Sequence, residues 1–317
     1  MTTIALPERS ATACALHPRL DGPILVATDG TQQSTGAFAA AVSISAGGTR
    51  RNERHARLPV HVITVCGALP IFVPEAVPAL PYSYADIRRT DMLAAATEQV
   101  RYNVANADGW QIQAASGPAA PTIADMAHEE GAALIVMGLG KHDLADRMFG
   151  SETAVRVMQQ ARTPVLAVPQ NWIGIPRRAL VAVDFGPASL RAAQSAMRIL
   201  APGASVCFAH VAPALGHPDH ADQLVEIYQA RLNEELDAFI AAVGVPDDMT
   251  VTRAPLYGDT PHALLEFARK EHIDLIVAGT RGRNALTRLV LGSVATSIVR
   301  GAQCAVLVAS AEKATDA

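Results

Sequence analysis

Short apolar runs alternate with segments of helical periodicity along the second half of the chain. Each run is continuously apolar rather than alternating, which is typical of strands that are buried on both faces of a parallel sheet. The helical segments between the runs favour crossover connections, so this half is predicted to be an α/β unit with a doubly wound parallel sheet. Strands are expected at about Ala179–Val183, Ser205–Val211, Thr250–Pro255, Leu275–Ala278 and Ala305–Val308.

The helix expected between the second and third of these strands has the clearest period. Apolar residues at intervals of three and four predict one buried face, and the polar residues between them predict a solvated face. The apolar positions are Leu224, Tyr228, Leu232, Leu236, Phe239 and Val243, and the polar ones are Glu226, Arg231, Glu234 and Asp237. The first half has a similar helix with Met92, Ala96, Val100 and Val104 on one face, and its basic segment Arg50–Arg57 is interpreted as a solvated loop.

The two halves carry the same elements in the same order. Ile24–Gly30 corresponds to Leu180–Gly186, Ala133–Gly138 to Asp274–Gly279, Gly150–Ser151 to Gly292–Ser293, and Pro164–Val168 to Ala305–Ala309. Such a repeat predicts a tandem duplication of one α/β domain. Two prolines, Asn171 and Gly174 mark a linker at Pro169–Pro176. We therefore expect an N-terminal tail at residues 1–20, a first domain at 21–169 and a second domain at 177–311.

A glycine-rich loop in the second half carries the most chemical information. Gly279 and Gly282 follow the apolar run, and Gly292 and Ser293 open the next helical segment. The first amides of a helix lack intrahelical partners and carry the positive end of the helix dipole, so they favour a phosphate. Arg281, Arg283 and Arg288 add positive charge to the loop. The spacing is neither a Walker A sequence nor the dinucleotide fingerprint Gly-x-Gly-x-x-Gly.

The spacing Gly-x2-Gly-x9-Gly-Ser resembles the ATP-binding signature of the universal stress protein family. The resemblance extends across nearly the whole chain, through Val181–Asp184, His210–Val211 and Tyr257–Pro261. It implies a Rossmann-like domain of the adenine-nucleotide α-hydrolase type that binds ATP, with Mg²⁺ accompanying the phosphates. The implied binding residues are Ala182, Val183, Asp184, Val211, Gly279, Thr280, Arg281, Gly282, Arg283, Gly292, Ser293 and Val294.

Several of these residues have a simpler interpretation as well. Asp184 is expected at the base and ribose end of the pocket, or else acts only as a cap or turn residue. Val211 lines the adenine slot or is a plain core valine, and the three arginines support phosphates or are solvated charges.

Histidines at two other places are also candidates for a functional role. His217, Asp219 and His220 form a cluster, which we interpret as a loop before a helix rather than a metal site, because no further ligand is visible. His262 lies in the first turn of a helix, near the nucleotide mouth or simply on the surface.

The corresponding loop of the first half departs from the signature. Gly138 and Gly140 are separated by one residue, where Gly279 and Gly282 are separated by two. Residues 139–152 carry two basic and three acidic side chains, a balance of −1, whereas residues 280–293 carry three arginines and no acid, a balance of +3. Glu152 places a carboxylate in the first helical turn, where it would repel a phosphate by about 1 to 4 kcal/mol. We interpret the first-half site as degenerate or altered.

Composition and charge limit the classes of protein to which the chain can belong. The 317 residues suffice for two domains, and 50% hydrophobic with 18% charged residues is a globular balance. A net charge of −4 argues against a nucleic-acid partner, and the sequence shows neither a membrane span nor a secretion signal, which favours a cytoplasmic protein. The cysteines Cys14, Cys66, Cys207 and Cys304 lack Cys-x-x-Cys spacing and are interpreted as reduced thiols.

The sequence offers binding chemistry without an evident general base or nucleophile. We therefore expect a nucleotide-binding regulator, not an enzyme, whose state is read by unidentified protein partners. A slow ATPase or a nucleotidyl-type transferase on the related fold, and a structural pseudo-dimer without nucleotide, stay as alternatives.

The last strands of the two domains also suggest how the halves associate. Family members commonly pair through this edge strand, so Val165–Val168 and Val306–Val308 are expected to form an intramolecular pseudo-dimer. A homodimer of the tandem chain through helical faces is left open.

Overall fold

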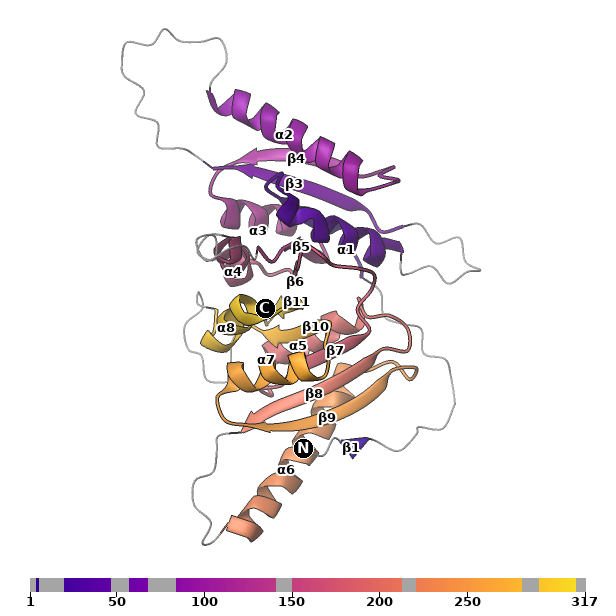
Figure 1. The fold of residues 1–317 in the computed structure, drawn as a ribbon, viewed down its shortest axis with the longest axis vertical. Coiled ribbons are helices and arrows are strands. Elements are labelled where there is room, and N and C mark those ends of the chain that lie inside the picture. Colours follow the sequence, from indigo (N-terminus) through magenta and orange to yellow (C-terminus); the bar gives the residue numbers. More distant parts are fainter. Residues whose placement is uncertain are drawn as a thin grey trace, which may run out of the picture. The chain divides into compact units, whose positions relative to one another are not determined.

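The computed structural model divides the chain into two compact units (Figure 1). One unit is Asp21–Gly174, here the first domain; the other is Ile175–Ala317 together with Met1–Leu20, here the second domain. The structure describes residues 4–5, 20–46, 57–67, 84–140, 150–212, 221–280 and 291–311. The segment expected as a solvated loop at Arg50–Arg57 lies almost wholly outside these residues.

The first domain contains a five-stranded parallel sheet of order β4-β3-β2-β5-β6. Helix α1 packs against α2, and α3 packs against α4. The strands are β2 (Ile24–Thr28), β3 (Val60–Cys66), β4 (Gln111–Ser116), β5 (Leu134–Gly138) and β6 (Val165–Val168). The helices are η1 (Gln32–Ser34), α1 (Thr35–Ala46), α2 (Tyr84–Asn103), α3 (Ala119–Glu129) and α4 (Gly150–Gln160).

The second domain repeats this arrangement with the order β9-β8-β7-β10-β11. Its strands are β7 (Arg178–Ala182), β8 (Ser205–Ala212), β9 (Thr250–Tyr257), β10 (Leu275–Gly279) and β11 (Ala305–Ala309). Its helices are α5 (Pro187–Met197), α6 (Ala221–Val243), α7 (Thr260–Lys270) and α8 (Ser293–Gly301). Both domains therefore confirm the predicted α/β fold class with a parallel sheet.

The apolar runs form the centre of each sheet. Every residue of β2, β6 and β11 is buried, as are the first four of β5 and β10, because helices cover these strands. In α6 the predicted apolar face is buried at Leu232, Leu236, Phe239 and Val243, whereas the side chains of Leu224 and Tyr228 lie outside the described residues. In the first domain Ala96, Val100 and Val104 are buried and Met92 is half-buried.

The N-terminal residues contribute one further strand to the second domain. β1 (Ile4–Ala5) pairs antiparallel with β9, with Ile4 opposite Arg253 and Ala5 opposite Thr252. This pairing lies on the outer edge of β9 and was not part of the sequence-based expectation. Among the described residues, no helix is both long enough and apolar enough to cross a lipid bilayer.

The strand order reverses at the same place in each domain. The chain runs outward from β2 through β3 to β4 and then returns to β5 on the other side of β2; β7, β8, β9 and β10 follow the same path. Parallel sheets bind ligands beyond the carboxyl ends of the strands at such a reversal. Ligand binding is therefore expected at the ends of β2 and β5 in the first domain, and at the ends of β7 and β10 in the second.

Candidate functional site

In the second domain, backbone bonds fix both ends of the glycine-rich loop. The Thr280 amide donates to the Ala309 carbonyl at 2.9 Å, and the Gly292 amide donates to the Thr280 carbonyl at 2.7 Å. The start of α8 is therefore held at the end of β10. Arg281, Gly282, Arg283 and Arg288 lie outside the described residues.

The first turn of α8 presents amides without a side-chain cap. Gly292 is the N-cap residue, with φ −57° and ψ 150°, and as a glycine it has no side chain that can accept from the following amides. Ser293, the first helical residue, is exposed, and Val294 is half-buried. These amides are donors at the positive end of the helix dipole, so they suit an anion.

Gly279 is required by packing rather than by an unusual torsion angle. A Cβ at this position would lie 2.7 Å from the Ser189 amide nitrogen and 2.9 Å from the Ala188 carbonyl carbon. The glycine therefore lets the start of α5 approach the end of β10. The start of α5 thus lies at the end of β10, where α8 is also held.

Asp184 anchors the turn between β7 and α5. Its Oδ1 accepts hydrogen bonds from the Gly186 amide at 2.8 Å and from Ser189 Oγ. The N-cap of α5 is Gly186, so Asp184 stabilises the turn and does not cap the helix. Among the described residues, the second carboxylate oxygen of Asp184 has no hydrogen-bond partner and can accept from a ligand.

The remaining predicted residues lie on the neighbouring strand ends. Ala182 ends β7 and Val211 lies near the end of β8, and both are half-buried, whereas Val183 is buried and donates its amide to the Ala209 carbonyl at 2.8 Å. His210 Nδ1 lies 2.8 Å from the Val183 carbonyl oxygen. The structure thus brings the predicted strand-end residues and the start of α8 to one edge of the sheet.

Comparison with known proteins assigns the family. The model of the universal stress protein family matches residues 22–169 and again residues 176–310. The chain belongs to the universal stress protein family. A universal stress protein of Methanocaldococcus jannaschii is 29% identical over 154 residues, which are 46% of this chain and 89% of that protein.

Two solved structures share the fold and match along nearly the whole chain. A universal stress protein from Archaeoglobus fulgidus superposes with a TM-score of 0.59 at 18% identity, covering 92% of this chain and 97% of that one. A protein of unknown function from Pseudomonas aeruginosa PAO1 has a TM-score of 0.57 at 17% identity, with 91% and 92% covered. At these identities the likeness shows the fold.

The first universal stress protein domain has its own cavity at the equivalent edge. The cavity has a volume of about 340 Å³ and lies at the ends of β2, β3 and β5. It is lined by Ala27, Thr28, Asp29, Gln33, Ser34, Val65, Ala119, Ile123, Met137, Gly138, Gly140 and Thr153. The sequence predicted an altered site here but gave no indication of its size.

The residues that follow β5 begin with the same backbone bond as those that follow β10. The Leu139 amide donates to the Val168 carbonyl at 2.7 Å, as Thr280 does to Ala309, so Leu139 takes the place of Thr280. The next residue, Gly140, already has φ 56°, in the left-handed region that favours glycine. The shorter glycine spacing of this turn stays a prediction from the sequence, because residues 141–149 and 281–290 lie outside the described part.

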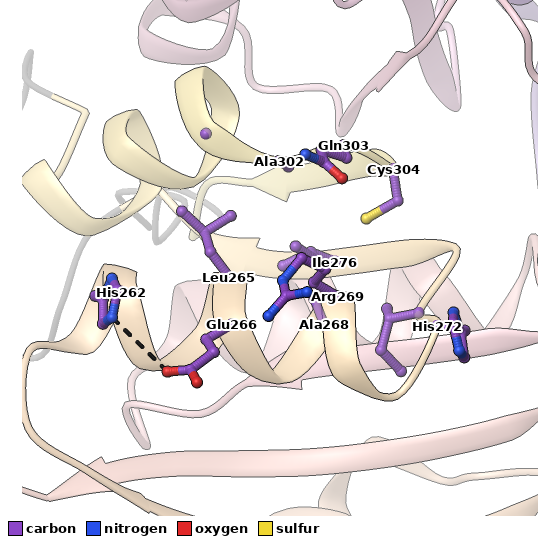
Figure 2. Close-up of a pocket in the computed structure, with 12 residues that line it drawn as sticks. His262, Leu265, Glu266, Ala268, Arg269, His272, Ile276, Ala302, Gln303 and Cys304 are labelled. Atoms are coloured by element: carbon purple, nitrogen blue, oxygen red, sulfur yellow. Dashed lines mark ion pairs between the residues drawn. The ribbon is translucent and has the colours of Figure 1, made fainter.

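A larger groove in the second domain is separate from the strand-end residues (Figure 2). Its volume is about 710 Å³, and it follows α7 from His262, continues past the end of this helix to His272, and reaches the C-terminal end of α8 at Gly301. His262 Nε2 lies 3.7 Å from Glu266 Oε2, and both side chains are exposed. The interpretation of His262 as a surface residue thus fits its place better than a role at the nucleotide mouth.

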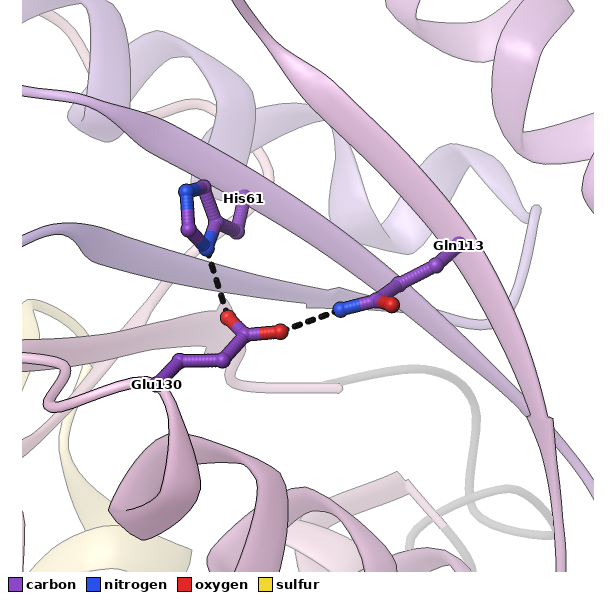
Figure 3. A network of polar contacts seen from close by, with 3 residues as sticks. All are labelled: His61, Gln113 and Glu130. Carbon is purple, nitrogen blue, oxygen red and sulfur yellow. Dashed lines mark hydrogen bonds and ion pairs between the residues drawn. The ribbon is translucent and has the colours of Figure 1, made fainter.

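Polar side chains also form a network at the other end of the first-domain sheet (Figure 3). Glu130 Oε2 lies 2.6 Å from His61 Nδ1, and Glu130 Oε1 accepts from Gln113 Nε2. These side chains join the beginnings of β3 and β4 to the end of α3. They serve the structure of the domain and lie away from its cavity.

Metal ligands are not gathered anywhere in the described part of the chain, where no group of three or more His, Cys, Asp or Glu side chains is placed to hold an ion. His217, Asp219 and His220 lie outside it. The described cysteines Cys66, Cys207 and Cys304 are not in disulfides. Burial raises the pKa of the Cys207 thiol to about 11.

Proposed function

We propose that this universal stress protein is a regulator that binds ATP in its second domain, with Mg²⁺ accompanying the phosphates. One observation carries the proposal: the bond from Gly292 to Thr280 holds the uncapped first turn of α8 at the switch point beside Asp184. A helix start at a strand-order reversal is a favourable place for phosphates. Family membership supports the same ligand class.

Each candidate residue has a distinct role in this proposal. The amides of Ser293 and Val294 and the Ser293 hydroxyl would donate to the phosphates, with Arg281 and Arg283 of the adjoining loop adding positive charge. The free oxygen of Asp184 would accept from the ribose hydroxyls.

The adenine base and the Mg²⁺ ion require fewer protein contacts than the phosphates do. The base would lie against the half-buried Val211 and Ala182. Mg²⁺ needs few protein ligands when phosphate oxygens and water supply the others, so it fits a site without a carboxylate cluster.

The decisive variant is Gly292→Val. A branched side chain at the N-cap would stand where the phosphates must approach the amides, so calorimetry should show loss of ATP binding with an unchanged circular dichroism spectrum. Ser293→Ala removes one hydroxyl donor to a charged group and should weaken binding by about 1 to 3 kcal/mol. ATP affinity in Gly292→Val equal to that of the parent would place the phosphate site elsewhere.

The rate of ATP hydrolysis distinguishes a regulator from a slow ATPase. We expect phosphate release from ATP to be no faster with the parent than with Gly292→Val. A clearly higher rate in the parent would instead support the slow ATPase. Mass spectrometry of the protein purified from cells should detect bound ATP and identify the regulatory proteins that copurify with it. If the purified protein carries no nucleotide, the result supports the structural pseudo-dimer instead.

A further inference from the structure

We propose that the cavity of the first domain binds an unphosphorylated nucleoside rather than a nucleotide. This inference rests on the proposed function, because it takes the two domains to share one frame for base and sugar. The shared frame is visible in the structure: Asp29 bonds to Ser34 as Asp184 does to Ser189. The strand register likewise places Val65 where the second domain has Val211.

The sugar end of the cavity has a preorganised acceptor. Asp29 Oδ1 accepts from the Thr31 amide at 2.9 Å, from Thr31 Oγ1 at 2.8 Å and from Ser34 Oγ at 3.1 Å. Its Oδ2 has no partner among the described residues, and Asp29 is exposed at the cavity. One carboxylate oxygen is thus fixed by the turn while the other is available to a pair of ligand hydroxyls.

The wall behind Asp29 is held by a second set of bonds. Thr28 Oγ1 donates to Gln99 Oε1 at 2.6 Å and accepts from the Gly30 amide at 3.0 Å. Gln99 Nε2 in turn donates to the Thr31 carbonyl. These bonds tie α2 to the turn after β2, so the cavity wall needs little reorganisation when a ligand enters.

The rest of the cavity suits a flat, uncharged ring. Val65, Ile123 and Met137 provide an apolar lining, and the volume of about 340 Å³ is near the lower end of the roughly 300 to 1,000 Å³ of small-molecule sites. None of the described lining residues is a lysine, arginine or histidine. A ligand with a base and a sugar matches these features, and a triphosphate does not.

Charge at the start of α4 excludes the phosphates. Glu152 lies in the first turn of α4, one residue before Thr153, which lines the cavity. The corresponding residue of the second domain is Val294. A carboxylate already stabilises the positive end of this helix dipole, and it would repel an incoming phosphate. The first domain therefore keeps the acceptor for a sugar and replaces the phosphate site with an acid.

The test is calorimetric titration of the full chain with adenosine, AMP and ATP. In the Gly292→Val background, adenosine should bind at one site per chain, and AMP and ATP should bind at least about tenfold more weakly because of the carboxylate. Glu152→Gln should raise AMP affinity by about tenfold or more and leave adenosine affinity within about twofold.

Two further variants locate the adenosine site. Asp29→Asn keeps an oxygen for the turn but replaces the free acceptor, and should weaken adenosine by about tenfold or more. Ala119→Phe places a ring in the cavity from a half-exposed position and should abolish adenosine binding. Both should leave ATP binding by the parent second domain unchanged.

The outcomes separate this inference from the proposed function. The inference is overturned if adenosine fails to bind, or if AMP binds the Gly292→Val protein as tightly as adenosine does. It is also overturned if neither Asp29→Asn nor Ala119→Phe weakens adenosine binding. Loss of adenosine binding in Gly292→Val alone would move the ligand to the second domain and also overturn it. None of these outcomes tests the proposed function, which fails instead if the parent does not bind ATP or if ATP binding is unaffected by Gly292→Val.

Discussion

In Asp29 and Asp184, one carboxylate oxygen holds a turn, and the other has no hydrogen-bond partner among the described residues. In each, Oδ1 bonds to a serine hydroxyl five residues later and to a turn amide. The resemblance predicted Asp184 as a site residue, and the alternative role in a turn is also present. Ser189 was missed, although the same five-residue spacing at Asp29 and Ser34 was readable in the repeat.

The first glycine of each loop should be intolerant of a Cβ because of helix packing. At Gly138 a Cβ would lie 2.7 Å from the Gln33 carbonyl oxygen, as at Gly279 it would meet Ser189. Gly138→Ala should destabilise the first domain by about 1 to 3 kcal/mol through overpacking. Both tryptophans, Trp110 and Trp172, lie in this domain, so their fluorescence in urea reports its unfolding alone.

Gly67→Ala is the matched control for Gly138→Ala. A Cβ at Gly67 meets nothing within 4 Å, so this variant should be neutral or stabilising by up to about 1 kcal/mol. Equal stability of the two variants would show that Gly138 is not needed for the approach of η1.

The thiols should differ in reactivity according to burial. Cys207 is buried in β8 and its pKa is raised to about 11 because burial disfavours the thiolate, so it stays protonated at pH 8. Since the thiolate is the nucleophile, alkylation by iodoacetamide should be far slower at Cys207 than at the partly exposed Cys304. Peptide mass spectrometry measures both, with urea-unfolded protein as the control; equal rates in the folded protein would contradict the burial of Cys207.

At the scale of elements, α4 and α8 are equivalent helices of the two domains, and their first turns differ in charge. α4 begins at Gly150 and α8 begins directly after its N-cap Gly292, but their first turns carry Glu152 and Val294. The sequence identified this difference because the repeat aligns the two starts. It did not reveal the cavity beside α4, which depends on the packing of β3 and α3 around Asp29.

Val294→Glu should transfer the acidic character of α4 to α8. The introduced carboxylate would stand beside the proposed phosphates and should weaken ATP binding by roughly one to three decades in Kd. Val294→Gln, which has a similar shape but no charge, should have a much smaller effect. Equal affinity of the two variants in calorimetry would mean that charge at this turn does not govern binding.

Strands were predictable from the sequence because continuous apolar runs form the covered centre of each sheet. The predicted Thr250–Pro255 extends to Tyr257, and the predicted Ala179–Val183 begins and ends one residue earlier, because backbone pairing rather than hydrophobicity sets a strand's limits. The contact of Asp237 on α6 with Arg253 on β9 could not be predicted, since Asp237 was expected on a solvated face. Burial lowers the pKa of Arg253 at this contact.

At the scale of the whole molecule, the duplication was readable but the path of the N-terminus was not. The hydrophobic pattern predicts a parallel sheet in each half, and the family resemblance predicts which edge of the sheet binds the ligand. Nothing in Ile4–Ala5 indicates that these residues pair with β9, because a two-residue strand has no periodicity to detect. The residues interpreted as a tail thus include one strand of the second domain's sheet.

Pairing through the last strand of each domain stays a prediction for the intact chain. β11 ends the second domain's own sheet, with β10 as its neighbour there. An isolated fragment from Arg177 to Ala317 should therefore dimerise to cover this apolar edge, and Val306→Lys in the fragment should give a monomer. Sedimentation velocity measures both states, and a parent fragment that stays monomeric at high micromolar concentration would contradict edge pairing.

The central claim is that one chain binds one ATP, in the second domain. Calorimetric titration of nucleotide-free full-length protein with ATP in the presence of Mg²⁺ tests it most directly. The account predicts a single tight site per chain that disappears in Gly292→Val and persists in Asp29→Asn. Two equivalent tight sites per chain, or one site that survives Gly292→Val, would contradict it.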